Sequence, residues 1–156
     1  SKQCSVVGFD SMPEAKEMRQ HLNSLGLDKL QNLNAEVNYY HKANSGIGYH
    51  GDSERKKVFA MNYGLNRVIE FQCFEGGMEV GESVKIELKH GDIYAMCVIA
   101  SGNNWKQVMN RRGCKHFRHR AGFPEYLEKD DKARLLKAKR KIKLWNSQRK
   151  KIKVLI

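Results

Sequence analysis

The sequence predicts a β-rich α+β fold, in which a compact body of short strands lies between an N-terminal helix and a basic C-terminal helix. Two changes in periodicity predict it. Apolar residues recur with a helical period up to Gly26, with a period of two between residues 34 and 120, and with a helical period again from Glu125. Turn residues separate the period-two segments, and several such strands are typical of a sandwich or barrel. A chain of 156 residues can form one domain of this kind.

Residues 10–27, DSMPEAKEMRQHLNSLGL, predict the first helix. Ser11 and Glu14 have the spacing of a capping box, in which each side chain satisfies a backbone N–H of the first turn. Pro13 suits the same turn because its missing N–H is not needed there. Apolar residues follow one side of the segment, and Gly26 is a suitable C-terminal stop.

The middle of the chain predicts the strands of the body. The expected strands are residues 34–41, 57–63, 67–74, 83–90, 92–100 and 113–120, with loops at 75–82 and 101–107. Alternation is clearest in RVIEFQCF, where Ile69, Phe71 and Cys73 share one face. The run DIYAMCVIA is apolar throughout, which is typical of a strand buried on both faces.

The C-terminal part of the chain holds most of its charge. The net charge is +12, and residues 129–153 carry twelve Lys and Arg against Asp130 and Asp131, which leaves +2 for the rest. This division predicts a domain body at 1–124 and a basic helical extension at 125–156. One reading of the extension is a solvated helix face, and the other is an arm that contacts phosphates or an acidic partner. The residues expected to contact nucleic acid are Lys137, Lys139, Arg140, Lys141, Lys143, Arg149, Lys150 and Lys151.

The four cysteines and the hydropathy profile indicate an intracellular protein of the cytoplasm or nucleus. The cysteines form no C-x-x-C pair, and three of them lie in apolar, strand-like runs. Free buried thiols in a reducing compartment explain this usage. A signal peptide is not evident, and no apolar run approaches the ~18 residues of a membrane span.

The segment GIGYHGDSERKK, residues 46–57, contains the clearest candidate for chemistry. His50 and Asp52 are two residues apart, so in a strand their side chains would point to the same face. One imidazole and one carboxylate are two of the three ligands of the 2-His-1-carboxylate triad that holds non-haem Fe(II). The same two residues could also be ordinary polar groups of a turn. A metal site requires a third ligand, for which His116 and His119 near the end of the body are available.

Three stretches together resemble the AlkB-like branch of the Fe(II)/2-oxoglutarate-dependent oxygenases, in particular compact forms from giant viruses and marine microbes. They are NYYHKANSGIGYHGDSE, VKIELKHGDIYAMCVIASGNNWKQ and FRHRAG, within residues 34–122. The resemblance implies a double-stranded β-helix, or jelly roll, which agrees with the period-two pattern. It also implies Fe(II) and 2-oxoglutarate as cofactors, and a viral or microbial origin.

The resemblance assigns roles to individual positions. The matching residues are His50 and Asp52 as iron ligands and catalytic residues, and Asn38, Tyr40, Arg112 and Arg118 as 2-oxoglutarate contacts. An arginine suits this last role because its planar guanidinium can bind a carboxylate through two hydrogen bonds.

The third iron ligand is where the sequence departs from the family. The usual W-x-H reads Trp-Lys-Gln at residues 105–107, and Gln107 would be a poor iron ligand. The compact forms end in L-R-H-A-A-G, and the matching FRHRAG favours His119. Strand alternation argues against His119. If Arg118 faces inward, His116 faces inward with it and His119 faces outward, unless a bulge changes the alternation. Three possibilities therefore stay open: His119, His116, or no third protein ligand.

The expected function is that of a 2-oxoglutarate-dependent dioxygenase that oxidises a C–H or N-methyl group, with nucleic acid as the expected substrate. The nucleotide-gripping extension of the repair enzymes has no counterpart in the sequence, which leaves the substrate open. Two alternatives are a catalytically degenerate nucleic-acid-binding or structural protein of the same fold, and a hydroxylase of protein side chains. The sequence gives no indication of the oligomeric state.

Overall fold

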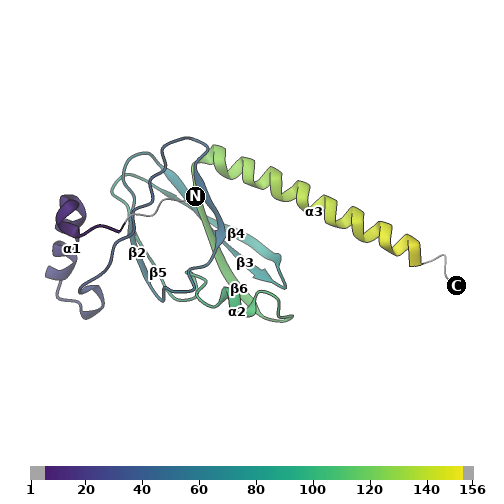
Figure 1. Ribbon diagram of the computed structural model, residues 1–156, viewed down its shortest axis with the longest axis horizontal. Coiled ribbons are helices and arrows are strands. Elements are labelled where there is room, and N and C mark those ends of the chain that lie inside the picture. The colour runs from purple at the N-terminus through teal and green to yellow at the C-terminus, as the bar shows by residue number, and fades with distance from the viewer. Residues whose placement is uncertain (1–5, 153–156) are drawn as a thin grey trace. The chain divides into compact units, whose positions relative to one another are not determined.

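The computed structural model describes residues 6–152, except for the side chains of Lys29 and of residues 145–152. The chain divides into two units, residues 1–39 and 40–156, which are described separately (Figure 1). Among the described helices, none has both the length and the apolar content that crossing a membrane requires.

The N-terminal unit is helical. It contains the 3-10 turns η1 (Phe9–Ser11) and η2 (Asp28–Leu30) on either side of α1 (Pro13–Ser24), which confirms the expected first helix. The capping box is wrong: Met12 is the N-cap, it makes no side-chain capping bond, and Ser11 belongs to η1. The strand expected at 34–41 is also wrong, since this segment is neither helix nor strand. Its alternation has no neighbouring strand to stabilise it, and Val37 and Tyr39 are exposed.

The second unit is a β-body followed by a long helix. Its strands are β1 (Gly46–His50), β2 (Val58–Met61), β3 (Arg67–Glu75), β4 (Met78–Leu88), β5 (Ile93–Met96) and β6 (Lys115–Gly122). Its helices are α2 (Trp105–Val108) and α3 (Pro124–Ile152). The structure thus confirms a β-rich α+β fold with a C-terminal helix, although β5 is shorter than the run 92–100 predicts because residues 97–104 turn.

The strands form two antiparallel sheets, ordered β1-β6-β3-β4 and β2-β5. Their pairing is nested: β3 and β4 form the inner hairpin, β2 pairs with β5 outside it, and β1 pairs with β6 outside both. Successive pairs alternate between the two sheets, and β6 closes the larger sheet by lying beside β3. In Figure 1, β2 and β5 form a separate layer beside the larger sheet.

The hydrophobic core lies between the two sheets. Ile69 of β3, Leu88 of β4 and Met96 of β5 form its buried cluster, with Phe71 and Tyr94 packed against it. The same residues line a largely apolar cavity of about 230 Å³. One face of β3 therefore lines an apolar cavity between the sheets.

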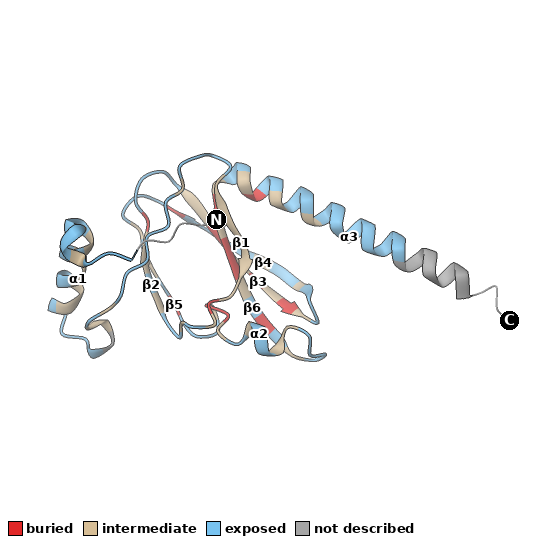
Figure 2. Cartoon of the chain, in the orientation of Figure 1, coloured by how far each residue is buried: buried red, intermediate tan, exposed pale blue. Residues whose placement is uncertain are grey.

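The other face of the larger sheet is covered by the first turns of α3. A Cβ on Gly46 or Gly122 would come within 2.2 or 2.7 Å of the Tyr126 ring, so only glycine lets this ring lie against the sheet. Leu127 is buried beside it. Beyond Arg134 the described side chains of α3 are exposed, as the pale blue ribbon in Figure 2 shows.

Candidate metal centre

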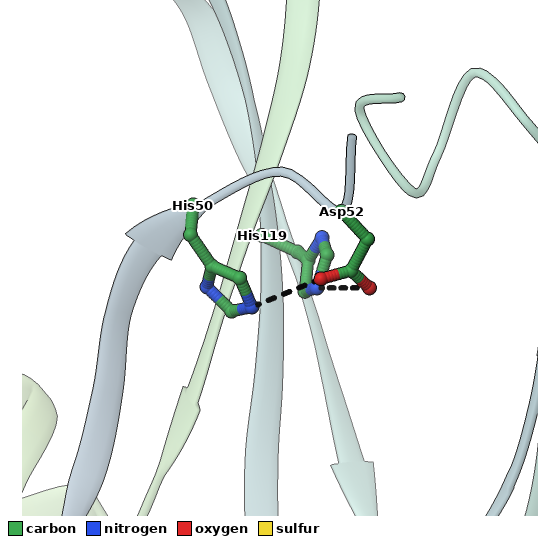
Figure 3. Close-up of side chains that lie close together, drawn as sticks. All are labelled: His50, Asp52 and His119. Atoms are coloured by element: carbon green, nitrogen blue, oxygen red, sulfur yellow. Dashed lines mark ion pairs between the residues drawn. The ribbon is translucent and has the colours of Figure 1, made fainter. Parts of the chain in front are cut away.

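The structure brings His50, Asp52 and His119 together (Figure 3). One ligand atom from each lies within 4.8 Å of the other two. The Asp52 carboxylate approaches both imidazoles, with Oδ1 3.7 Å from His50 Nε2 and Oδ2 3.8 Å from His119 Nε2. These distances are too long for hydrogen bonds. Ligands ~2.1 Å from one ion and at right angles lie ~3 Å apart, so a small contraction would enclose an ion.

A bulge in β1 turns His50 toward His119. Ile47 pairs with Ala121, but His50 pairs with His119, so β1 has one residue more than β6 over this stretch. Without the extra residue, Tyr49 would stand opposite His119 and His50 would point to the other face. Tyr49 instead contacts Phe74 on that other face, with ring centroids 5.4 Å apart. Bulges commonly redirect side chains next to active sites.

The loop that carries Asp52 is fixed by the segment 101–105. The Asp52 N–H donates to the Ser101 carbonyl at 2.8 Å. The Asn103 amide donates to the carbonyls of Ser53 and Arg55 at 2.9 and 3.0 Å. The Trp105 indole Nε1 donates to the Gly51 carbonyl at 2.6 Å. Bonds on both sides of Asp52 therefore determine where its carboxylate lies.

The surroundings of the two histidines suit a role as neutral metal ligands. His50 Nδ1 lies 2.8 Å from the Gly48 carbonyl, which can only accept, so Nδ1 carries the proton and Nε2 is free to bind. Burial, together with the nearby His50, lowers the pKa of His119 to about 4. His119 is therefore neutral at pH 7, as a metal ligand must be.

The donor set fits a divalent transition metal. Two imidazole nitrogens and one carboxylate on one side of an ion leave the remaining coordination positions open, which is the arrangement of non-haem Fe(II) sites. Asp52 and His119 are 8% and 5% exposed, so an ion bound here would be well shielded, whereas His50 is half-buried. The open positions would then face the space between the sheets.

Arg118 and His116 lie on the opposite face of β6 from His119. The pairing of β6 with β3 has no bulge, so alternate residues of β6 face opposite sides. Arg118 Cζ lies 4.6 Å from the Phe74 ring centroid, and its Nε donates to His116 Nε2 at 3.2 Å. Arg118 therefore does not face this centre, contrary to the predicted contact with 2-oxoglutarate. His116 does not face it either, contrary to its place among the candidate ligands.

The remaining sequence-predicted contacts fall in different places. Arg112 is exposed in the turn before β6, and the four residues from Lys115 to His119 span ~13 Å. The structure thus does not bring Arg112 to the centre. Asn38 belongs to the N-terminal unit, is exposed, and donates to Glu36 Oε1 at 3.2 Å.

Tyr40 belongs to the β-body and contacts an arginine that sequence reasoning missed. The Arg67 guanidinium carbon lies 5.0 Å from the Tyr40 ring centroid. Arg67 shares the face of Ile69 and Phe71, and the Phe71 ring lies 6.0 Å from His119. Arg67 Nε is buried with no hydrogen-bond partner among the described residues. The period-two alternation of the segment 67–74 already indicated that Arg67 lies on the same face as Ile69 and Phe71.

The Tyr94 phenol is close enough to Arg67 and to Asp52 for both charges to act on it. Burial is the main cause that raises the pKa of the Tyr94 phenol; Arg67 lowers this pKa and the Asp52 carboxylate raises it. Both charges therefore act on the phenol. Tyr94 also lines the cavity between the sheets. Tyr94 is therefore a wall residue of this cavity that responds to the charges of Arg67 and Asp52.

The residues of α3 that the sequence predicts to contact nucleic acid are exposed where they are described. These are Lys137, Lys139, Arg140, Lys141 and Lys143. The side chains of Arg149, Lys150 and Lys151 lie outside the described residues.

Comparison with known proteins gives one relative of unknown function. No family model matches the sequence, and no solved structure matches it. An uncharacterized protein of Acanthamoeba polyphaga mimivirus is 38% identical over 100 residues, which cover 64% of this chain. The matched region spans 38% of that relative's length. The similarity fits the expected viral origin and leaves the function to be argued from the site.

Proposed function

We propose that this protein is a mononuclear non-haem iron oxygenase that uses 2-oxoglutarate. The observation that carries the proposal is the convergence of His50, Asp52 and His119, two imidazoles and one carboxylate, beside a cavity between two sheets. When bound, Fe(II) with 2-oxoglutarate would supply the activation of dioxygen needed to oxidise a C–H or N-methyl group.

The side chains of this chain would hold and orient these groups. His50, Asp52 and His119 would bind the iron. Arg67 would bind the distal carboxylate of 2-oxoglutarate, because its buried Nε lacks a partner and a guanidinium binds a carboxylate through two N–H groups. The Tyr94 hydroxyl, with a raised pKa, would stay protonated and could donate to the same ligand. The apolar cavity lining would exclude water from the reacting groups.

The nested pairing of the strands supports a jelly-roll reading of the fold. In a jelly roll a long antiparallel hairpin is wound so that successive strand pairs fall alternately in two facing sheets. The pairs β3–β4, β2–β5 and β1–β6 follow this rule. Among the described residues, an outer pair is missing: 34–41 is not a strand, and α3 follows β6. We therefore propose a jelly roll shortened by one strand pair.

Nucleic acid is the proposed substrate class. The exposed segment 135–144 of α3 carries five basic residues and no acidic residue. Such a segment attracts phosphates without regard to base sequence. An alkylated base would have to be unpaired or flipped to reach an internal metal centre. The alternatives that the same fold allows are a protein hydroxylase and a non-catalytic binding protein.

The test is anaerobic titration of the protein with Fe(II) and 2-oxoglutarate, read as the weak visible charge-transfer band of the chelate. We expect the band with the native protein and with His116→Ala, and its loss with His50→Ala or His119→Ala. The matched pair of histidine changes on one strand separates loss of a ligand from a general loss of fold. A native protein that gives neither the band nor succinate in air would overturn the oxygenase proposal and favour the binding protein.

The substrate class is tested separately. With turnover established by succinate, formaldehyde release from methylated oligonucleotides is expected. Succinate without formaldehyde, but with an oxygen added to a peptide, would favour the protein hydroxylase.

A further inference from the structure

The face of the larger sheet away from the metal centre contains a stack of three side chains. The Arg118 guanidinium lies between two aromatic rings, 4.6 Å from the Phe74 centroid and 4.7 Å from the Trp105 centroid. Phe74 belongs to β3, Arg118 to β6 and Trp105 to α2, so the stack connects the sheet to the segment after the 97–104 turn. A planar guanidinium can stack on a ring with each of its faces, which an ammonium cannot do.

Trp105 connects this stack to the metal ligands. Its indole Nε1 donates at 2.6 Å to the carbonyl of Gly51, the residue between His50 and Asp52. The fit is close, because a Cβ on Gly51 would lie 2.4 Å from the Trp105 ring and 2.5 Å from the Gly102 carbonyl. The indole therefore fixes the backbone between two of the three ligands.

Arg118 connects the stack to the third ligand. It directly precedes His119 on β6, so anything that holds the Arg118 backbone also holds that of His119. A second contact acts in the same place: a Cβ on Gly102 would lie 2.3 Å from the Phe117 carbonyl, so the Gly102 backbone rests on β6. The His50–Asp52 loop and the His119 strand are thus held to each other through Trp105 and Arg118.

Arg118 has a feature that packing alone does not explain. Its Nη2 is buried with no hydrogen-bond partner among the described residues, and burial lowers the pKa of the guanidinium. An unpaired buried donor costs stability, and an apolar side chain in this place would avoid that cost. The arrangement favours the geometry of the stack over the best local stability.

We infer that Arg118 and Trp105 are positioning residues for the metal centre, which set the spacing between His119 and the His50–Asp52 pair from the far side of the sheet. The inference rests on the proposed metal site and adds a role that the site itself does not require. Supporting residues of this kind commonly change metal affinity by 10- to 100-fold, so roughly that loss is expected when the stack is broken.

The experiment is titration of metal-free protein with Co(II), read as binding affinity and as the visible d–d spectrum. Arg118→Met is expected to weaken binding by about 10-fold or more and to change the spectrum. Arg118→Lys keeps the positive charge but lacks the planar guanidinium. This variant is expected to bind Co(II) as weakly as Arg118→Met. Arg112→Met, which removes an exposed arginine from the turn before β6, is the matched control and should bind Co(II) like the native protein.

A second variant separates positioning from folding. Trp105→Phe keeps a ring in the stack but removes the Nε1 donor, so its metal affinity should fall while the metal-free protein stays folded with a thermal unfolding midpoint close to native. Native affinity and spectrum in both Arg118→Met and Trp105→Phe would overturn the inference, and so would full rescue by Arg118→Lys. Absence of Co(II) binding by the native protein would instead overturn the metal site itself, and the inference with it.

Discussion

The Arg120 guanidinium lies 2.6 Å from the Glu70 carboxylate, and both side chains are almost wholly buried, at 1% and 3% exposed. The pair lies on the sheet face that α3 covers. Asp130 and Asp131 of α3 each approach the same guanidinium to 2.7 Å. One arginine therefore joins β3, β6 and α3.

Removal of this arginine is expected to destabilise the fold strongly. Arg120→Met removes the nearest cation from the buried Glu70 carboxylate and leaves it the Lys85 ammonium at 3.9 Å. Loss of one member of a buried pair costs about 3–5 kcal/mol. Urea unfolding followed by circular dichroism measures the change. Lys132→Met removes the exposed pair with Glu128 on α3 and should leave the midpoint unchanged. Equal midpoints for the two variants would contradict a role of Arg120 in holding α3.

Gly51→Ala is expected to abolish metal binding. The new methyl group would overlap the Trp105 ring and the Gly102 carbonyl, and the loop between His50 and Asp52 would have to move. Co(II) titration measures the loss. Gly8→Ala is a suitable control, because its added methyl group meets no atom within 4 Å. Retention of native affinity by Gly51→Ala would show that the loop position is not critical.

Arg67→Met is expected to weaken the binding of 2-oxoglutarate and to leave the binding of the metal unchanged. A hydrogen-bonded charge contributes about 1.5–3 kcal/mol, which corresponds to a 10- to 150-fold higher half-saturating concentration. The charge-transfer band at varied 2-oxoglutarate measures this, and Co(II) affinity should stay native. The comparison variant is Arg112→Met, at a position that the sequence predicted for the same role. An effect of Arg112→Met that equals or exceeds that of Arg67→Met would return the assignment to Arg112.

Acid is expected to destabilise the metal-free protein below pH 6.5. The pKa of His119 is lowered to about 4 in the folded protein. Between pH 6.5 and pH 4 this imidazole is therefore protonated in the unfolded chain and neutral in the folded chain. The free energy of unfolding therefore decreases as the pH is lowered from 6.5 to 4. Below pH 4 this group causes no further decrease. Burial also lowers the pKa of His116, which acts in the same direction. Urea midpoints at several pH values should show a smaller slope for His119→Asn than for native protein, and an unchanged slope would contradict a buried neutral His119.

Neutralisation of exposed lysines on α3 is expected to weaken nucleic-acid binding. The double change Lys139→Gln and Lys141→Gln should reduce the slope of log affinity against log salt by up to about 2, since each phosphate contact contributes roughly 0.9. Fluorescence anisotropy with a labelled oligonucleotide measures it. The double change Lys89→Gln and Lys115→Gln removes the same charge from the β-body. Equal slopes for the two double variants would assign the attraction to net charge and not to α3.

Local spacing was sufficient to find some features and insufficient for others. The pattern H-x-D identified His50 and Asp52, and period-two alternation located β3 and the later part of β4, whereas residues 78–82, expected in a loop, are strand. The third ligand could not be chosen in this way, because β6 has polar residues on both faces: His116, Arg118 and Arg120 on one, His119 on the other. The hydropathy pattern therefore does not show which side of such a strand faces the core. Its orientation depends on pairing with β3 and on the bulge in β1, which are contacts between distant segments.

The nesting of the strands has a consequence for the order of assembly. Of the three candidate metal ligands, His50 and His119 belong to the outermost pair and Asp52 follows β1 directly, and that pair meets only after the chain between β1 and β6 has folded back on itself. Contacts of such long sequence separation form late, because their loop-closure entropy is offset only when the inner pairs exist. A partly folded chain would therefore hold His50 and His119 far apart and bind metal poorly. Metal that binds only the finished fold adds to its stability by mass action, so occupancy of the centre would report completed folding.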